Sequence, residues 1–160
     1  MSGLINFLNT ALPVLYLLAA AAYGLQFFRN HPLATKLASP ILQGVVIVHL
    51  FEITARSFVY KHFPMASIYE AMSVIALAMA IVYIFIETRI KVKSTGFFIL
   101  IFIFAFQFFS SLFISLSNQI NPILKSPLLA VHSSSAILGY SAFAISAIYG
   151  LMYLLLFYNL

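Results

Sequence analysis

Residues 96–117, GFFILIFIFAFQFFSSLFISLS, form an apolar run without a charged residue, and this run decides the fold. A helix needs about 20 apolar residues to cross the hydrocarbon core of a bilayer. The phenylalanines would occur on every side of such a helix rather than along one face. The run therefore predicts a membrane-spanning helix whose phenylalanines face lipid and neighbouring helices.

Other stretches of the chain have the same character, and together they predict five transmembrane helices. They cover about 4–27, 40–60, 66–88 and 127–158. The whole chain is 64% hydrophobic and 7% charged, whereas soluble domains carry about 25% charged residues. We therefore expect an all-α polytopic membrane helix bundle, with residues 1–160 forming one transmembrane domain in a lipid bilayer.

Helix-start signals precede three of these stretches. The Ser-Pro dipeptides at 39–40 and 126–127 each predict an N-cap followed by proline at the first helical position. Ser67 and Glu70 have the spacing of a capping box, in which each residue bonds to the backbone near the other. We therefore expect helices to begin at these points.

Basic residues between the stretches predict the orientation of the chain, because cytoplasmic loops carry an excess of Lys and Arg. One side has Arg29, Lys36, Arg89, Lys91 and Lys93, and the other has Arg56, Lys61 and Lys125. Five against three favours the first group as cytoplasmic. We therefore expect the N-terminus outside and the C-terminus inside.

The composition excludes several classes of function. Without cysteine, the chain forms no disulfide, no thiolate metal site and no covalent haem attachment. It has no aspartate, no HExxH or GxSxG motif and no glycine-rich phosphate loop, so we do not expect an enzyme. The net charge of +5 comes mostly from basic residues between apolar stretches, so we expect no nucleic-acid partner.

Ionisable residues occur inside the second stretch, where His49, Glu52 and Arg56 lie along one helix face. Such groups are costly in a membrane unless they are paired, and they are functional candidates by default. One interpretation is a Glu52–Arg56 ion pair with His49 hydrogen-bonded to a neighbouring helix. One alternative is that His49 is a metal or haem ligand. The other is that these residues form a proton path.

The last stretch carries His132 close to its start, near the expected outer surface. A neutral imidazole is what a metal or haem iron needs. Below His132 the small residues form a seam at helical spacing, made of Ser135, Gly139, Ala142, Ser146 and Gly150. Such a seam lets another helix or a flat ligand come close. Ordinary helix packing with a capping histidine is the alternative.

The outward loop before the third stretch gathers Lys61, His62, Tyr69 and Glu70. His62 lies in the loop, where it is either solvated or able to swing toward a bound ligand. Glu70 has helix capping as its simpler role.

Two segments together resemble the cytochrome c assembly family, the CcsA/ResC/HemX-like haem-handling membrane proteins. Residues 61–72, KHFPMASIYEAM, resemble the family's GHFPxxNxYESL stretch, and residues 132–143, HSSSAILGYSAF, resemble its HVxxxxLGYAxF helix. The two segments have the family's order and a similar spacing, so the resemblance covers roughly residues 45–158.

The resemblance implies a component of cytochrome c maturation in the bacterial inner (plasma) membrane that binds or presents non-covalent b-type haem. The histidine that opens the family's HVxxxxLGYAxF helix is taken as an axial haem ligand, which implies this role for His132. A second ligand would come from His62, from His49, which loosely matches a membrane-embedded histidine of the family, or from a partner chain.

The resemblance also suggests residues around the haem. Lys61, Lys125 and Tyr69 would meet the haem propionates. Tyr69 and Glu70 match the family's YE pair, whose role is structural or pocket-forming.

The chain departs from the family in one large respect. Haem-delivering members carry a tryptophan-rich WWD segment after the matching helix, whereas this sequence contains no tryptophan and resembles only the N-terminal half. Three explanations agree with the missing segment. The chain is a short paralogue, it is half of a split system whose partner membrane protein carries the segment, or the sequence is incomplete.

Two other functions agree with the same residues. A HemX-like regulatory or scaffolding subunit without haem is favoured by the missing segment. A small respiratory subunit with a b-type haem between His49 and His132 is disfavoured, because the two histidines are expected at different depths.

Overall fold

The computed structural model describes residues 2–91, 93–114 and 126–158. These residues form five helices and no strand: α1 (Ser2–Arg29), α2 (Pro32–Tyr60), α3 (Ile68–Ile90), α4 (Gly96–Phe113) and α5 (Pro127–Tyr158). Each is long and apolar enough to cross a membrane. The prediction of an all-α, multi-pass membrane protein is therefore confirmed.

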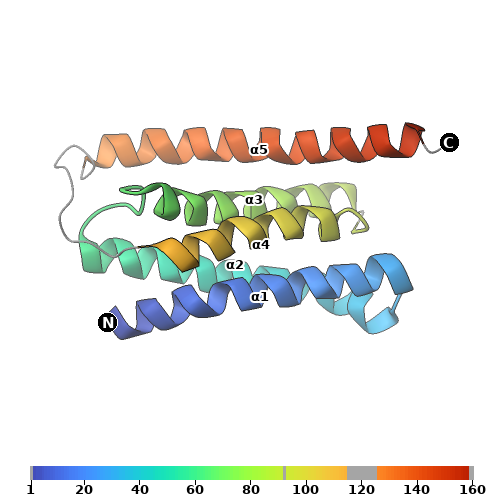
Figure 1. Cartoon of the computed structure of the whole chain (residues 1–160), viewed down its shortest axis with the longest axis horizontal. Helices are drawn as coiled ribbons and strands as arrows, with labels where there is room; N and C mark the ends of the chain where they lie inside the picture. The colour runs from blue at the N-terminus through green and yellow to red at the C-terminus, as the bar shows by residue number, and fades with distance from the viewer. Residues whose placement is uncertain (1, 92, 115–125, 159–160) are drawn as a thin grey trace.

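The helices α1 to α4 form a closed bundle, and α5 lies along one side of it (Figure 1). Around the bundle, α1 packs against α2 and α4, and α3 packs against α2 and α4. Helix α5 lies mainly against α3 and touches α4 only slightly, and the described residues show no packing of α5 on α1 or α2. We refer to α1–α4 below as the bundle.

The start of α2 differs from the prediction, because the helix begins at Pro32 and contains Pro40. Pro32 follows His31, whose backbone is extended, and so takes the first helical position that proline favours. The hydroxyl of Ser39 donates to Glu87 of α3 instead of capping a helix. This tertiary bond helps to hold helical backbone around Pro40, which lacks the N–H that would bond to the carbonyl of Lys36.

The other helix ends agree more closely with expectation. Ser67 caps α3 by accepting a hydrogen bond from the Glu70 backbone N–H at 3.1 Å, and the Glu70 carboxylate accepts from the Ala66 N–H at 2.7 Å. The predicted box therefore forms, with its return bond one residue earlier than expected. Helix α5 begins at Pro127 as predicted. Helix α4 ends at Phe113, and the predicted continuation over 115–117 lies outside the described residues.

The buried face of α4 carries aliphatic residues in its first half and the polar Gln107 and Ser110 further on, but no phenylalanine. Ile99, Leu100 and Ile103 are fully buried, whereas Phe102 and Phe109 are 46% and 48% exposed. Several phenylalanines of α4 therefore lie on the outside of the bundle, where lipid would surround them.

Candidate functional site

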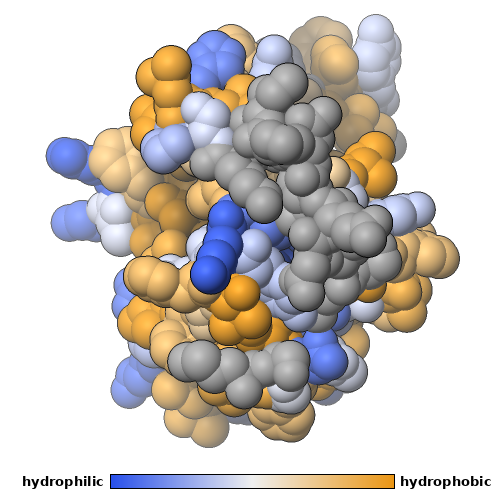
Figure 2. All heavy atoms as spheres, turned by 90° about the vertical axis from the view of Figure 1, so that its left-hand side faces the viewer, coloured by the Kyte–Doolittle hydropathy of each residue, from blue (hydrophilic) through white to orange (hydrophobic). Residues whose placement is uncertain are grey.

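Figure 2 shows the end of the molecule at which α1 begins, with hydrophilic residues near its middle and a mixture of hydrophobic and hydrophilic residues toward its rim. The helix directions bring the end of α2 and the starts of α3 and α5 to this same end (Figure 1). Most of the predicted site residues belong to these helix ends. The opposite end collects Arg29, Lys36, Arg89, Lys91 and Lys93.

A chain of hydrogen bonds runs through the interior of the bundle and includes His49. Tyr16 Oη of α1 lies 2.9 Å from His49 Nδ1, and Ser73 Oγ of α3 lies 2.9 Å from His49 Nε2. Ser73 Oγ donates its one proton to Gln107 Oε1 of α4 at 3.1 Å, so it accepts from His49 Nε2–H. Nδ1 of the neutral ring then accepts from the Tyr16 hydroxyl.

The chain continues from Gln107 to the beginning of α1. Gln107 Nε2 donates to Ser111 Oγ at 3.2 Å, and Ser111 Oγ donates to the Asn9 carbonyl at 2.7 Å. Arg56 Nη2 donates to Asn9 Oδ1 at 3.3 Å. The network therefore joins α1, α2, α3 and α4, so its polar groups hold the bundle together where apolar contacts compete poorly with lipid.

Glu52 and Arg56 form the predicted ion pair, and both side chains are fully buried. Glu52 Oε2 and the Nε and Nη1 atoms of Arg56 have no hydrogen-bond partner among the described residues. Ordered water is a common partner for such groups. The prediction of a neutralised pair beside a hydrogen-bonded His49 is confirmed.

His49 is poorly placed for iron in this conformation. Its ring is fully buried, and each nitrogen takes part in a hydrogen bond. Because Tyr16 donates to the only lone pair of the neutral ring, a metal would have to displace Tyr16. A ligand role for His49 stays a prediction with this requirement attached.

The sequence reasoning missed a second buried polar cluster, centred on Glu87 near the basic end. The Glu87 carboxylate accepts hydrogen bonds from Tyr23 Oη of α1 and Ser39 Oγ of α2, and Glu87 is 6% exposed. The Tyr23 and Tyr83 rings meet edge to face with centroids 5.8 Å apart. Two sequence signals pointed to it: Glu87 is one of three acidic residues, and it follows Tyr83 at a spacing of one helical turn.

The loop between α2 and α3 holds the predicted residues in fixed positions. His62 is buried rather than solvated, because its Nδ1 lies 2.8 Å from the Phe63 carbonyl oxygen and its ring lies against Tyr60. The expectation of a solvated loop histidine is therefore wrong. Lys61 is exposed, with its backbone in the left-handed region at φ 55°.

The YE pair is likewise occupied by structural contacts. The Tyr69 ring packs against Phe113 of α4, with centroids 5.4 Å apart. Glu70 is buried and caps α3. Lys125, the other predicted propionate partner, lies outside the described residues.

His132 lies on the exposed face of α5 and makes no hydrogen bond with any of the described residues. The buried face of this helix consists of Ile137, Ser141, Ile145 and Ile148. At 100° per residue, His132 and the small-residue seam from Ser135 to Gly150 lie on the opposite side, and the seam residues are exposed. The bundle therefore covers neither His132 nor the seam.

The cavity closest along the chain to His132 is small. It measures about 190 Å³ and lies between the loop residues Phe63 and Met65 and the first turns of α5, where Ser133 lines it. Ligand pockets usually measure about 300–1,000 Å³. A ligand of haem size would thus meet His132 on the exposed face of α5 rather than in this cavity.

The chain keeps its two histidine candidates apart. His49 lies inside the bundle on α2, whereas His132 faces away from it on α5. The described parts of α2 and α5 do not pack together. This separation agrees with the prediction that one haem is not shared between them.

Comparison with known proteins gave one family. A family model described as "Cytochrome C assembly protein" matches residues 65–160. Tyr69, Glu70 and His132 lie within the match, whereas His49 and His62 precede it, so the match begins later than the resemblance suggested. No curated protein and no solved structure matched the chain.

Proposed function

The chain belongs to the cytochrome C assembly protein family, and on this premise we propose that it binds or presents haem at the outer membrane face. Membership supports a role in cytochrome c maturation as a multi-pass membrane protein. The proposal adds the ligand: His132 supplies an axial nitrogen to a non-covalent b-type haem.

The position of His132 carries this proposal. The residue lies inside the family match, on a face of α5 that the bundle leaves exposed, and no described residue takes either ring nitrogen. A neutral imidazole with a free nitrogen is a ligand for haem iron. The exposed seam below it presents small side chains, which would let a flat group approach the helix closely.

The second ligand is more simply supplied by a partner chain than by this one. His62 is buried, and His49 would have to lose Tyr16. We propose a partner membrane protein of cytochrome c assembly that faces α5, with the exposed Lys61 near the propionates. The chemistry is ligation and transfer, so we propose that the chain is not an enzyme.

The proposed orientation in the membrane follows from the positions of the basic residues. Most of the basic residues gather at the end of the bundle where α1 ends and α4 begins. We propose that this end faces the cytoplasm of a bacterium and that the N-terminus faces outward. His132 would then lie at the outer face, where cytochrome c receives haem.

Haem content of purified protein tests the ligand. The wild-type chain, expressed in a haem-producing host and purified in detergent, should carry haem with the spectrum of an imidazole complex. His132→Gly should lower haem per chain by about tenfold or more, because even outer-shell partners of a metal contribute 10–100-fold in affinity. Added imidazole should restore the spectrum.

A matched control separates ligation from a general disturbance of α5. Leu128 is 81% exposed on the same helix, so Leu128→Gly should leave the haem content unchanged. Undiminished haem in His132→Gly would refute the assignment.

A scaffold without haem is the second candidate. The exposed face of α5 and the absence of a haem-sized cavity beside His132 in the described residues favour it. Wild-type protein that carries no haem and binds none on titration, while still capturing a membrane partner through α5, would support the scaffold.

A further inference from the structure

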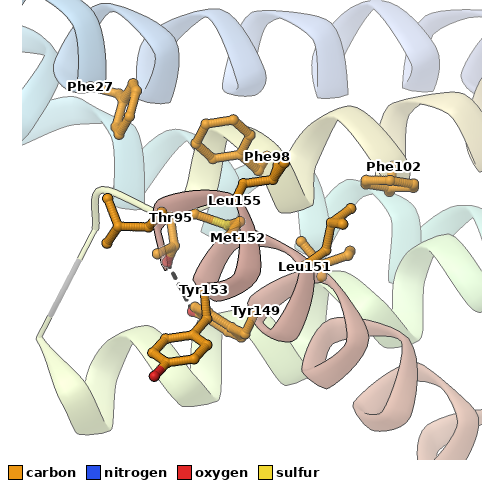
Figure 3. A pocket seen from close by; sticks show the side chains of 11 residues that line it. Phe27, Thr95, Phe98, Phe102, Tyr149, Leu151, Met152, Tyr153 and Leu155 are labelled. Atoms are coloured by element: carbon orange, nitrogen blue, oxygen red, sulfur yellow. Dashed lines mark hydrogen bonds between the residues drawn. The ribbon is translucent and has the colours of Figure 1, made fainter. Parts of the chain in front are cut away.

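A large apolar groove lies between the second half of α5 and the start of α4. Helix α5 packs mainly on α3 and only slightly on α4. The space between α4 and α5 measures about 620 Å³. Figure 3 shows Phe98 and Phe102 of α4 and Leu151 and Met152 of α5 around this space, with Phe27 of α1 beyond. The groove is remote in sequence from His132 and from the loop between α2 and α3.

The groove wall suits an apolar ligand. The hydroxyls of Thr95 and Tyr149, which both line it, lie 2.8 Å apart and bond to each other (Figure 3). Each of the two oxygens therefore has a hydrogen-bond partner without a ligand. The remaining wall is mainly phenylalanine, leucine, isoleucine and methionine.

The side chains of the groove favour a flexible chain over another helix. Helices associate in membranes through small residues that allow close approach of backbones. The small residues of α5 lie on its other face, whereas the groove is lined by large side chains such as Phe102 and Leu151. A helix seated here would leave gaps, but an acyl chain can follow an irregular surface.

Positive charge lies at the same end of the bundle as this groove. Arg29 is exposed and ends α1 two residues after Phe27, and Lys93 precedes Thr95 by two residues. Lys93 Nζ donates to the Thr35 carbonyl at 3.0 Å, which leaves it further protons to donate. The acidic residue of this end, Glu87, is buried and accepts from Tyr23 and Ser39.

The first turn of α4 adds to this positive character. Thr95 gives the first N–H groups of α4 no side-chain cap, since its hydroxyl bonds to Tyr149, and of these groups the Gly96 N–H bonds to the Lys93 carbonyl. Uncapped N–H groups at a helix start attract anions.

We infer that this groove binds an anionic phospholipid, with one acyl chain in the groove and the phosphate held by Arg29, Lys93 and the start of α4. Basic pockets between membrane helices are known sites for anionic headgroups, and basic residues near the membrane surface attract these headgroups. This inference does not depend on haem binding.

Native mass spectrometry of the full chain, released from vesicles of mixed phosphatidylglycerol and phosphatidylcholine, tests the site. The wild-type protein should retain phosphatidylglycerol at least severalfold over phosphatidylcholine. Leu151→Trp, which fills the groove, should remove most of the retained lipid. Leu154→Trp is the matched control, because Leu154 is similarly exposed, 51% against 55%, but does not line the groove.

The role of positive charge in the lipid preference is tested by separate substitutions. Arg29→Gln should abolish the preference for phosphatidylglycerol and leave total lipid nearly unchanged. Arg89→Gln, which removes a charge from α3 at the same end, should keep the preference. Equal retention by the two tryptophan variants, no preference for phosphatidylglycerol in the wild type, or a co-purifying protein displaced by Leu151→Trp would each overturn the inference.

Discussion

The bundle and α5 place their polar groups in opposite ways. The bundle buries an ion pair, a histidine and a glutamine among its helices, whereas α5 buries mainly isoleucines and exposes His132 and its small-residue seam. In a membrane, lipid solvates apolar side chains as well as protein does, so buried polar contacts specify the association of helices.

The two regions differ in what their polar groups contact. The bundle satisfies most of its described polar groups internally. Helix α5 turns His132 and its small-residue seam away from the bundle. Four substitutions test this contrast, in order of decreasing effect on stability.

The largest effect is expected inside the bundle from Arg56→Met. It leaves the Glu52 carboxylate buried without its partner, and breaking such a pair costs about 3–5 kcal/mol. Unfolding by SDS in mixed micelles measures the free energy. The double variant Glu52→Leu/Arg56→Met should regain most of the loss; equal loss in both would show that the pair is not the cause.

The second effect concerns Gly96 at the start of α4. A Cβ there would lie 2.3 Å from the Tyr23 ring and 2.4 Å from Tyr83 Oη, so the rings must move. Overpacking of this kind costs about 1–3 kcal/mol, and we expect Gly96→Ala to lower the free energy of unfolding by about 2 kcal/mol. An unchanged unfolding curve would mean that the Glu87 cluster is looser than described.

A smaller effect is expected from Tyr16→Phe, which removes the donor to His49 Nδ1. Hydrogen bonds between membrane helices contribute about 1 kcal/mol, so the unfolding free energy should fall by roughly that amount. Tyr140→Phe on α5, where Tyr140 is 71% exposed, should change nothing. Tyr16→Phe also leaves His49 Nδ1 without its donor, and a second haem signal in this variant would support His49 as a latent ligand.

The smallest effect is expected on the exposed face of α5. Nothing lies within 4 Å of a Cβ built at Gly139, so Gly139→Leu should alter the unfolding free energy by no more than about 0.5 kcal/mol. Haem content or capture of a partner should nevertheless fall, because the leucine fills the seam. A destabilised protein would show that the seam packs against this chain after all.

Local signals predicted the helices and the pair of charges. Apolar runs marked each span, the spacing of Glu52 and Arg56 placed them one turn apart, and Ser67 with Glu70 marked the start of α3. These features depend on residues close in sequence, so periodicity and capping rules are sufficient to find them.

The remaining features depend on contacts between distant residues. The Ser39–Glu87 bond keeps Pro40 inside a helix, and packing against Tyr60 with a bond to the Phe63 carbonyl buries His62. Gln107 joins the network although nothing adjacent to it is ionisable. The side of α5 that faces the bundle was also unpredictable, because isoleucines and small residues are both plausible packing surfaces in lipid.

The hydrogen bonds from Tyr16 to Asn9 all have the same direction, because each group donates a hydrogen bond to the next one. The row ends on the Asn9 backbone carbonyl, which can only accept, so the directions of the bonds before it follow from this end. His49 is consequently fixed as its Nε2-protonated tautomer, and nitrogen-15 spectra of the ring should show one set of signals with distinct pyrrole-type and pyridine-type nitrogens. The buried side-chain hydrogen bonds thus point in one direction across the helices, whereas the backbone hydrogen bonds of each helix point along it.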